Sequence, residues 1–164
     1  MIEKMQFVSI TGPKADIDRV VDQYLSRYEI HLENYCKVSA IEANTLLDMA
    51  QRRILPAVAR YTGDLAKGMA HKQEADLAGF CRIEDYLIRQ VSFQGGQLLD
   101  VCQDLAQALE KAPAADSGID AARYYREQVV NRTQKAGELV SQLESLVDAE
   151  AWPYPTYADI LFSV

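Results

Sequence analysis

The sequence predicts an all-α protein: an antiparallel bundle of three long helices, with one short N-terminal strand and an extended C-terminal tail. Apolar residues recur at steps of three and four along most of the 164 residues, and two stretches rich in Gly, Pro or small polar residues divide this pattern into three. A stretch rich in aromatic residues and proline follows the third part. Because short connections make sequential helices neighbours, the pattern favours an antiparallel bundle.

The first predicted helix is unusually long. Residues 4–10 alternate weakly between apolar and polar side chains, which indicates a strand, and Thr11-Gly12-Pro13 predicts a turn into the helix. From Ala15 onward a helical period continues with no turn signal before Gly63. The apolar residues with this period are Ile17, Val21, Tyr24, Tyr28, Leu32, Tyr35, Val38, Ile41, Leu46, Met49, Ile54, Val58, Tyr61, Leu65 and Met69.

Pro56 is the one residue in this stretch that disfavours a helix. A proline inside a helix removes a backbone hydrogen bond and clashes with the carbonyl four residues earlier. We therefore expect the first helix to bend between Arg52 and Pro56 and to continue beyond the bend.

Two further helices follow predicted turns at residues 68–79 and 112–118. Gly95-Gly96 lies inside the second helix and indicates either a close helix contact or a flexible joint. Ser117 or Asp120 is the expected cap of the third helix, which we expect to end near Ala151. The apolar stripe of the second helix comprises Ile83, Leu87, Val91, Leu98, Val101, Cys102, Leu105 and Leu109. The third helix has a seven-residue repeat that comprises Ala122, Tyr125, Val129, Arg132, Ala136, Leu139, Leu143 and Leu146.

The C-terminal tail joins two prolines and four aromatic rings. Pro153 and Pro155 fix their own φ angles and push the preceding residues toward extended geometry, so the tail should be short and stiff. We expect its rings to pack on the chain's own helices, and the alternative is an anchor for a partner or a neighbouring subunit. The candidate protein-contact residues are Trp152, Tyr154, Tyr157 and Phe162.

Composition argues against several classes of partner. The chain carries 17 Lys and Arg against 24 Asp and Glu, a formal net charge of −7, which disfavours binding to nucleic acid or to anionic membranes. No apolar run approaches the ~20 residues that a membrane span requires. Cys36, Cys81 and Cys102 are odd in number and form no C-x-x-C pair, so we expect a cytoplasmic protein without disulfides.

The sequence predicts no catalytic, cofactor-binding or metal-binding residue. No Gly-rich phosphate loop is present, and Gly95-Gly96 has neither a Lys-Ser/Thr after it nor a strand before it. His31 and His71 lack a second ligand at helical spacing, and Glu29 with Glu33 is typical of a solvated helix face. We therefore expect no cofactor and no enzyme activity, with protein partners or self-association instead.

From Ser26 to the C-terminus the chain resembles the C-terminal helical region of type III glutamine synthetase. The resemblance covers about five-sixths of the chain. In that family the ATP, metal and glutamate sites belong to an upstream β-rich catalytic domain, so the resemblance implies no active-site residue here. The residues that carry it are 26–35 (SRYEIHLENY), 41–43 (IEA), 47–50 (LDMA), 54–58 (ILPAV), 146–148 (LVD), 152–155 (WPYP) and Leu161-Phe162.

The first 25 or so residues resemble the start of subunit I of V-type ATPases. The similar residues are 1–14, together with Asp16-Ile17-Asp18-Arg19-Val20-Val21, and the resemblance runs on to Asn34. Two resemblances that overlap at residues 26–34 suggest a fusion, either natural or an assembly artefact. We therefore divide the chain into a subunit I-like head (1–25) and a synthetase-like bundle (26–164).

The leading functional hypothesis is a non-catalytic helical scaffold or oligomer-contact module. A truncated rotary-ATPase stator subunit that binds peripheral-stalk subunits is the second hypothesis, and one part of a split glutamine synthetase is the third. No constellation of residues in the sequence chooses among the three.

Overall fold

The structure is a computed structural model that describes residues 11–155 and 157–162, and all regular secondary structure in these ranges is helical. The strand predicted at residues 4–10 lies outside the described residues. The first helical run begins with α1 (Lys14–Met49), passes through a π-helical segment η1 (Ala50–Ile54) and continues as α2 (Leu55–Glu74). The carbonyl of Pro13 accepts the amides of Asp16 and Ile17 at 3.0 and 3.1 Å, which starts the helix.

The segment η1 lies where the sequence predicted a bend. The amide of Leu55 donates to the carbonyl of Ala50, five residues back, as in a π-helical turn. Pro56 has no amide hydrogen and takes the second position of α2. The proline is therefore accommodated by a wider turn just before it, and the helix continues.

The turn after α2 closes through Asp76, which adopts a φ of 58°. The amide of Leu77 donates to the carbonyl of Lys72 at 2.8 Å, and the amide of Asp76 donates to that of Gln73 at 3.2 Å. This pattern is the Schellman motif that ends many helices. The chain then passes through a 3₁₀ turn, η2 (Ala78–Phe80), into α3 (Arg82–Glu110).

The third predicted helix is divided in the structure. It comprises α4 (Gly118–Tyr124), a second π-helical segment η3 (Tyr125–Val130) and α5 (Asn131–Glu144). The two longest described α-helices are α1 and α3. Ser117 takes the cap position of α4 but makes no side-chain cap hydrogen bond. No proline or glycine pair in the sequence marks η3.

The predicted end of this helix near Ala151 is wrong, because α5 ends at Glu144. Beyond it the side-chain oxygen of Asp148 accepts the amide of Glu150 at 2.8 Å, and the carbonyl of Asp148 accepts the amide of Trp152 at 2.9 Å. Val147 and Trp152, which lie in and just after these turns, belong to the core cluster. The predicted extended tail is also only partly correct, since α6 (Tyr157–Phe162) is helical.

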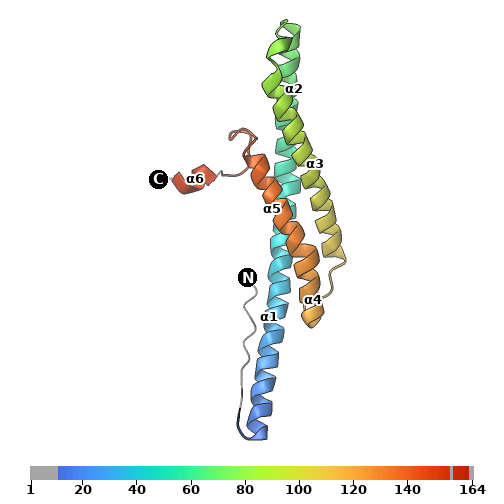
Figure 1. Ribbon diagram of the computed structural model, residues 1–164, viewed down its shortest axis with the longest axis vertical. Helices are drawn as coiled ribbons and strands as arrows, with labels where there is room; N and C mark the ends of the chain where they lie inside the picture. The colour runs from blue at the N-terminus through green and yellow to red at the C-terminus, as the bar shows by residue number, and fades with distance from the viewer. Residues whose placement is uncertain (1–10, 156, 163–164) are drawn as a thin grey trace.

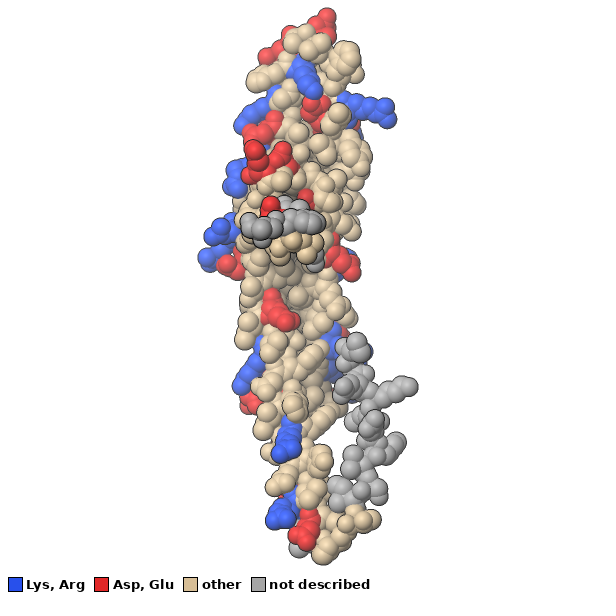
Figure 2. Space-filling view, turned by 90° about the vertical axis from the view of Figure 1, so that its left-hand side faces the viewer, with Lys and Arg blue, Asp and Glu red and all other residues tan. Residues whose placement is uncertain are grey.

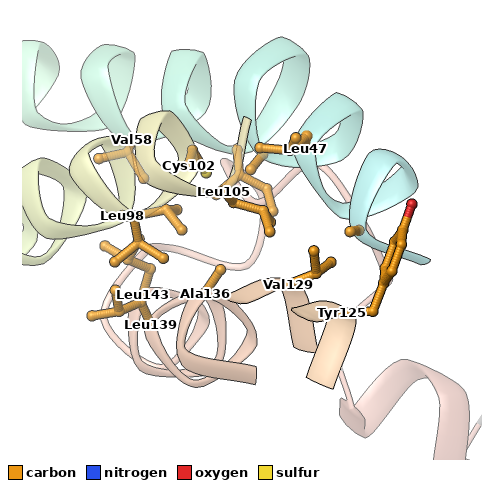
Figure 3. Close-up of a cluster of buried hydrophobic side chains, with 14 of the residues drawn as sticks. Leu47, Val58, Leu98, Cys102, Leu105, Tyr125, Val129, Ala136, Leu139 and Leu143 are labelled. Atoms are coloured by element: carbon orange, nitrogen blue, oxygen red, sulfur yellow. The ribbon is translucent and has the colours of Figure 1, made fainter. Parts of the chain in front are cut away.

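The three runs form an elongated antiparallel bundle (Figure 1). The first run (α1, η1 and α2) rises in this view, and the second run (α3) descends beside α2. The third run (α4, η3 and α5) rises again and packs against α1 and α3. Side chains from all three runs point into one core (Figure 3). Its fully buried members include Ile54, Val91, Leu98, Leu105, Val129 and Leu143.

Gly95 lies at a close approach between α2 and α3. A Cβ atom built on Gly95 would lie 3.0 Å from Cγ1 of Val58, whereas one on Gly96 would meet nothing within 4 Å. The glycine pair, for which the sequence allowed either a close contact or a joint, thus lies within an unbroken helix, with Gly95 at a close contact.

We expect opposite effects from alanine at these two neighbouring glycines. Gly96→Ala should raise the free energy of unfolding by about 0.5–1 kcal/mol, because alanine has less backbone freedom to lose. Gly95→Ala should lower it by about 1 kcal/mol, because buried, β-branched Val58 has little rotamer freedom with which to move aside. Urea denaturation of both variants measures the difference. An equal rise in the free energy of unfolding of both variants would contradict the prediction, because α2 and α3 would then have room to separate.

Candidate protein-contact surfaces

The first half of α1 extends beyond the rest of the bundle. Every side chain from Val21 to His31 is exposed, and Cys36 is the first fully buried residue of the helix. The lower end of α1 lies past the α3–α4 connection and has no described helix beside it (Figure 1). An amphipathic helix normally buries its apolar face, so this uncovered half is a candidate contact surface.

Most of the large apolar side chains of this half lie on one face, which we call the bare α1 stripe, whereas exposed Ile30 lies on the opposite face. The stripe comprises Ile17, Val21, Tyr24, Leu25 and Tyr28. Tyr24 is 57% exposed and Leu25 is 55% exposed. At 100° per residue the stripe runs directly into Leu32, which packs against the core, and then into Cys36. The face of α1 that is buried from Cys36 onward is therefore the same face that is exposed at residues 17–28.

A second set of exposed apolar side chains begins at the α2–α3 turn and continues along the first half of α3, and we call it the tip patch. Its members are Leu77, Phe80, Ile83, Tyr86 and Phe93. Phe80 is 73% exposed and Ile83 is 70% exposed. The sequence pattern placed Ile83 in the buried stripe of its helix. That placement is wrong, because the buried face of α3 begins at Val91.

An ion pair links the two helices behind the tip patch. Lys72 of α2 donates to Glu84 of α3, and the second oxygen of Glu84 is buried without a partner. The hydrogen bond from Lys72 lowers the pKa of Glu84, and the same bond raises the pKa of Lys72. The bond joins residues twelve positions apart and ties the start of α3 to the end of α2.

The described residues offer little for catalysis. A shallow depression is lined only by α1, through Asp18, Arg19, Asp22, Gln23, Ser26 and Arg27, so no second element closes over it. Across residues 11–155 and 157–162, no three His, Cys, Asp or Glu side chains group together as metal ligands. His31 and His71 are both exposed. Burial raises the pKa of the Cys36 and Cys102 thiols, which favours the unreactive protonated form.

Charge is distributed evenly on the face seen in Figure 2, where basic and acidic side chains alternate along the length of the molecule. Elsewhere among the described residues, charged side chains form ion pairs within one helix, such as Lys37 with Glu33 and Arg89 with Asp85. None of the described helices is both long enough and apolar enough to cross a membrane.

The four predicted contact residues of the tail have different environments. Trp152 is only 7% exposed and belongs to the core cluster, and Tyr154 is half-buried against that cluster. The side chains of Tyr157 and Phe162 lie outside the described set. Ile160 and Leu161 of α6 are exposed, and α6 stands away from the bundle (Figure 1). Whether any of the four contacts another chain stays a prediction.

The chain thus has the fold of an elongated all-α bundle with two uncovered apolar surfaces. Residues 21–73 match the family model described as the glutamine synthetase C-terminal domain. The chain is 26% identical over 143 residues to a glutamine synthetase of Butyrivibrio fibrisolvens, covering 87% of this chain and 20% of that protein. It is also 26% identical over 141 residues to the type-3 glutamine synthetase of Dictyostelium discoideum, covering 84% of this chain and 19% of the relative.

A glutamine synthetase of Bacteroides fragilis gives the same identity, over 84% of this chain and 19% of the relative. Over most of its length the chain is therefore homologous to the C-terminal domain of type III glutamine synthetase. It spans about one fifth of the length of the curated relatives that it matches. No solved structure matches the chain.

The resemblance to V-type ATPase subunit I gains no support from the family match or from these relatives. The family match begins at residue 21, inside the segment 1–25 that the sequence assigned to the subunit I-like head. Helix α1 passes through the predicted boundary at residues 25 and 26 without interruption. The division into two domains stays a prediction.

We predict that Trp152→Ala lowers the free energy of unfolding of the monomer by roughly 3–5 kcal/mol, the usual cost of removing a buried ring. Chemical denaturation measures the change, with Pro155→Ala as a control at an exposed position of the same tail. If Trp152→Ala instead reduces only the oligomer size and leaves stability unchanged, the ring acts between chains.

We also predict an acid-sensitive contribution from Glu84. Its pKa is lowered by folding, so its contribution to stability is complete above the ordinary carboxyl pKa of 4.5 and is lost as the pH falls through the lowered value. Thermal melts between pH 3 and pH 7 should show a smaller loss of Tm on acidification for Glu84→Gln than for the wild type. Exposed Glu74→Gln is the matched control, and a wild-type acid profile in Glu84→Gln would contradict the assignment.

Proposed function

We propose that this chain is a non-catalytic helical module that makes contacts between protein chains, equivalent to the C-terminal region of a type III glutamine synthetase. The observation that carries the proposal is the grouping of large exposed side chains into the bare α1 stripe and the tip patch. Single exposed apolar residues are ordinary on protein surfaces, whereas contiguous groups mark contact sites. Homology to one region of a larger family supports the same role.

Physical chemistry supports this reading of the two surfaces. Exposed Tyr and Phe side chains are the residue types that anchor protein interfaces, and Tyr24, Tyr28, Phe80, Tyr86 and Phe93 supply them here. The stripe belongs to a straight helix, a shape that suits packing along a second helix. The tip patch begins at a turn, a shape that suits insertion into a pocket or groove of another protein.

A second candidate is one part of a split glutamine synthetase whose catalytic part is encoded separately. The coverage favours it, since this chain corresponds to about one fifth of each matched synthetase. In this candidate the two surfaces would hold the catalytic chain. The stator-subunit hypothesis has only the short resemblance of the head in its favour.

Sedimentation velocity of the full chain, alone and mixed with a purified type III glutamine synthetase, tests the proposal. We expect the chain to sediment in a complex, either with itself or with the synthetase. We also expect no glutamine above a heat-treated control when the chain alone receives ATP, magnesium, glutamate and ammonium. A chain that stays monomeric alone and in the mixture would overturn the contact role.

The same measurements separate the other candidates. Glutamine made by the isolated chain would overturn the non-catalytic assignment. A rise in glutamine formation that appears only in the mixture would favour the split enzyme. Binding to purified peripheral-stalk subunits of a V-type ATPase, with none to the synthetase, would favour the stator subunit.

A further inference from the structure

We propose that the bare α1 stripe is the contact between two copies of this chain, which pair antiparallel through the first half of α1. The inference rests on the proposed contact function and assigns it a surface, a partner and an orientation. The starting observation is that one continuous apolar face of α1 is covered by α3, α4 and η3 from Cys36 onward and is uncovered before Leu32.

The length of the uncovered segment calls for a partner. At 1.5 Å per residue, residues 14–31 extend about 27 Å beyond the covered part of the helix. A helix of this length without tertiary contacts is only marginally stable in water, because most helical stability in proteins comes from packing an apolar face. A second helix along the stripe supplies that packing.

The stripe has enough area for a weak but specific dimer. A large aromatic side chain offers about 150–250 Å² of surface, so Tyr24 at 57% and Tyr28 at 42% exposure present on the order of 200 Å² together. Val21 and Leu25 raise the total to about 400 Å² per copy. Two such faces with their flanking side chains bury on the order of 1,000 Å², the lower limit for a specific interface. We therefore expect a weak, reversible dimer whose population rises with protein concentration.

The stripe is self-complementary when two copies run in opposite directions. In a register centred between Tyr24 and Leu25, each residue lies opposite the residue of the second copy for which the two residue numbers add up to 49. Ile17 then faces Leu32, Val21 faces Tyr28, and Tyr24 faces Leu25 of the second copy. Each pair places an aliphatic side chain against an aromatic or a second aliphatic one, so the apolar contact is unbroken along the whole segment.

The position of the bundle selects the same orientation. A second copy running parallel would bring its own α4 and η3 against those of the first copy, because both sets pack on α1 just above the stripe. In an antiparallel copy helix α1 begins at its own Lys14 near that point, and the bundle of that copy lies in the opposite direction. Only the antiparallel arrangement lets the full stripe be covered.

The edges of the stripe give the pairing a salt dependence. Asp18, Asp22 and Glu29 line one edge, at about 90° from the centre of the stripe, and Arg27 and His31 line the other. In an antiparallel pair each edge meets its own copy, so the acidic edges face each other. Added salt screens this repulsion and should strengthen the dimer, whereas it would weaken a parallel pair, in which the acidic edge meets Arg27.

Sedimentation velocity of the full chain across concentration tests the dimer, and cysteine cross-linking tests its orientation. The three native cysteines are buried, so an introduced one is the accessible thiol. Under mild oxidation, Tyr24→Cys should form a covalent dimer, because residue 24 lies beside the two-fold axis. Ile17→Cys should not cross-link to itself but should cross-link in a mixture with Leu32→Cys.

A charge placed in the stripe should break the dimer without unfolding the chain. Tyr24→Glu should weaken dimerisation tenfold or more, and Gln23→Glu, the same charge on the opposite face of α1, should leave it unchanged. Thermal melts followed by circular dichroism check that the bundle from Cys36 onward stays folded in both variants, and any helix lost in Tyr24→Glu should be limited to residues 14–31, which the broken dimer no longer covers. Equal dimerisation of Tyr24→Glu and the wild type would overturn the surface, and self-cross-linking of Ile17→Cys would overturn the orientation.

A wild-type chain that is monomeric at all concentrations would overturn the dimer. If deletion of residues 1–10 then produced one, the occupant of the stripe would be that segment of the same chain. A monomer that still sediments with the synthetase would leave the proposed contact function standing, so the two failures are distinguishable. A dimer abolished by Phe80→Ser but not by Tyr24→Glu would transfer the contact to the tip patch.

Discussion

The burial of one face of α3 holds this molecule together. Val91, Leu98, Cys102 and Leu105 are all fully buried, and α3 packs against α2 on one side and α5 on the other. Gly95 permits a close approach of α2 to α3 by leaving room for Val58. The tail depends on the same core, because Val147 and Trp152 complete the cluster built around α3 and α5. The first and third runs also touch directly, mainly through the contacts of α1 with α4, η3 and α5.

The bare α1 stripe follows from a mismatch of lengths around that central helix. The first run, residues 14–74, is about 90 Å long, whereas the 29 residues of α3 span about 44 Å. α3 lies beside α2 and reaches only the second half of α1, so no other described helix covers the first half of α1. The bare α1 stripe is the part of the core face that α3 and its companions are too short to cover.

The helical runs could be predicted from sequence because burial imposes a period of three and four residues on the apolar positions. Pro56 also located η1, since a missing amide hydrogen perturbs the helix at a definite place. The tertiary consequences could not be predicted in the same way. Periodicity identifies an apolar face but not the length of the neighbour that covers it, so Val21 and Val91 have the same pattern and opposite exposure. The end of α5 depends on the turn at Asp148, and η3 has no local signal at all.

The candidate site was accessible to sequence reasoning only in part. The tail was correctly identified as a place where aromatic side chains need cover, and Trp152 finds that cover in its own chain. The tip patch was missed, because Tyr86 and Phe93 lie on the face of α3 opposite its apolar stripe. A single exposed aromatic side chain produces no periodic pattern in the sequence. The seven-residue spacing between Tyr86 and Phe93 was the one sequence feature that could have indicated a shared exposed face.

Amide hydrogen exchange along α1 measures the central claim most directly, because it reports where tertiary cover begins. At protein concentrations below dimerisation, we expect strong protection from Cys36 to Met49 and fast exchange from Lys14 to Ile30. Protection of the first segment should then rise with concentration while that of the second stays constant. Equal protection of both segments at the lowest concentration would contradict the account, because the stripe would then be covered within a single chain.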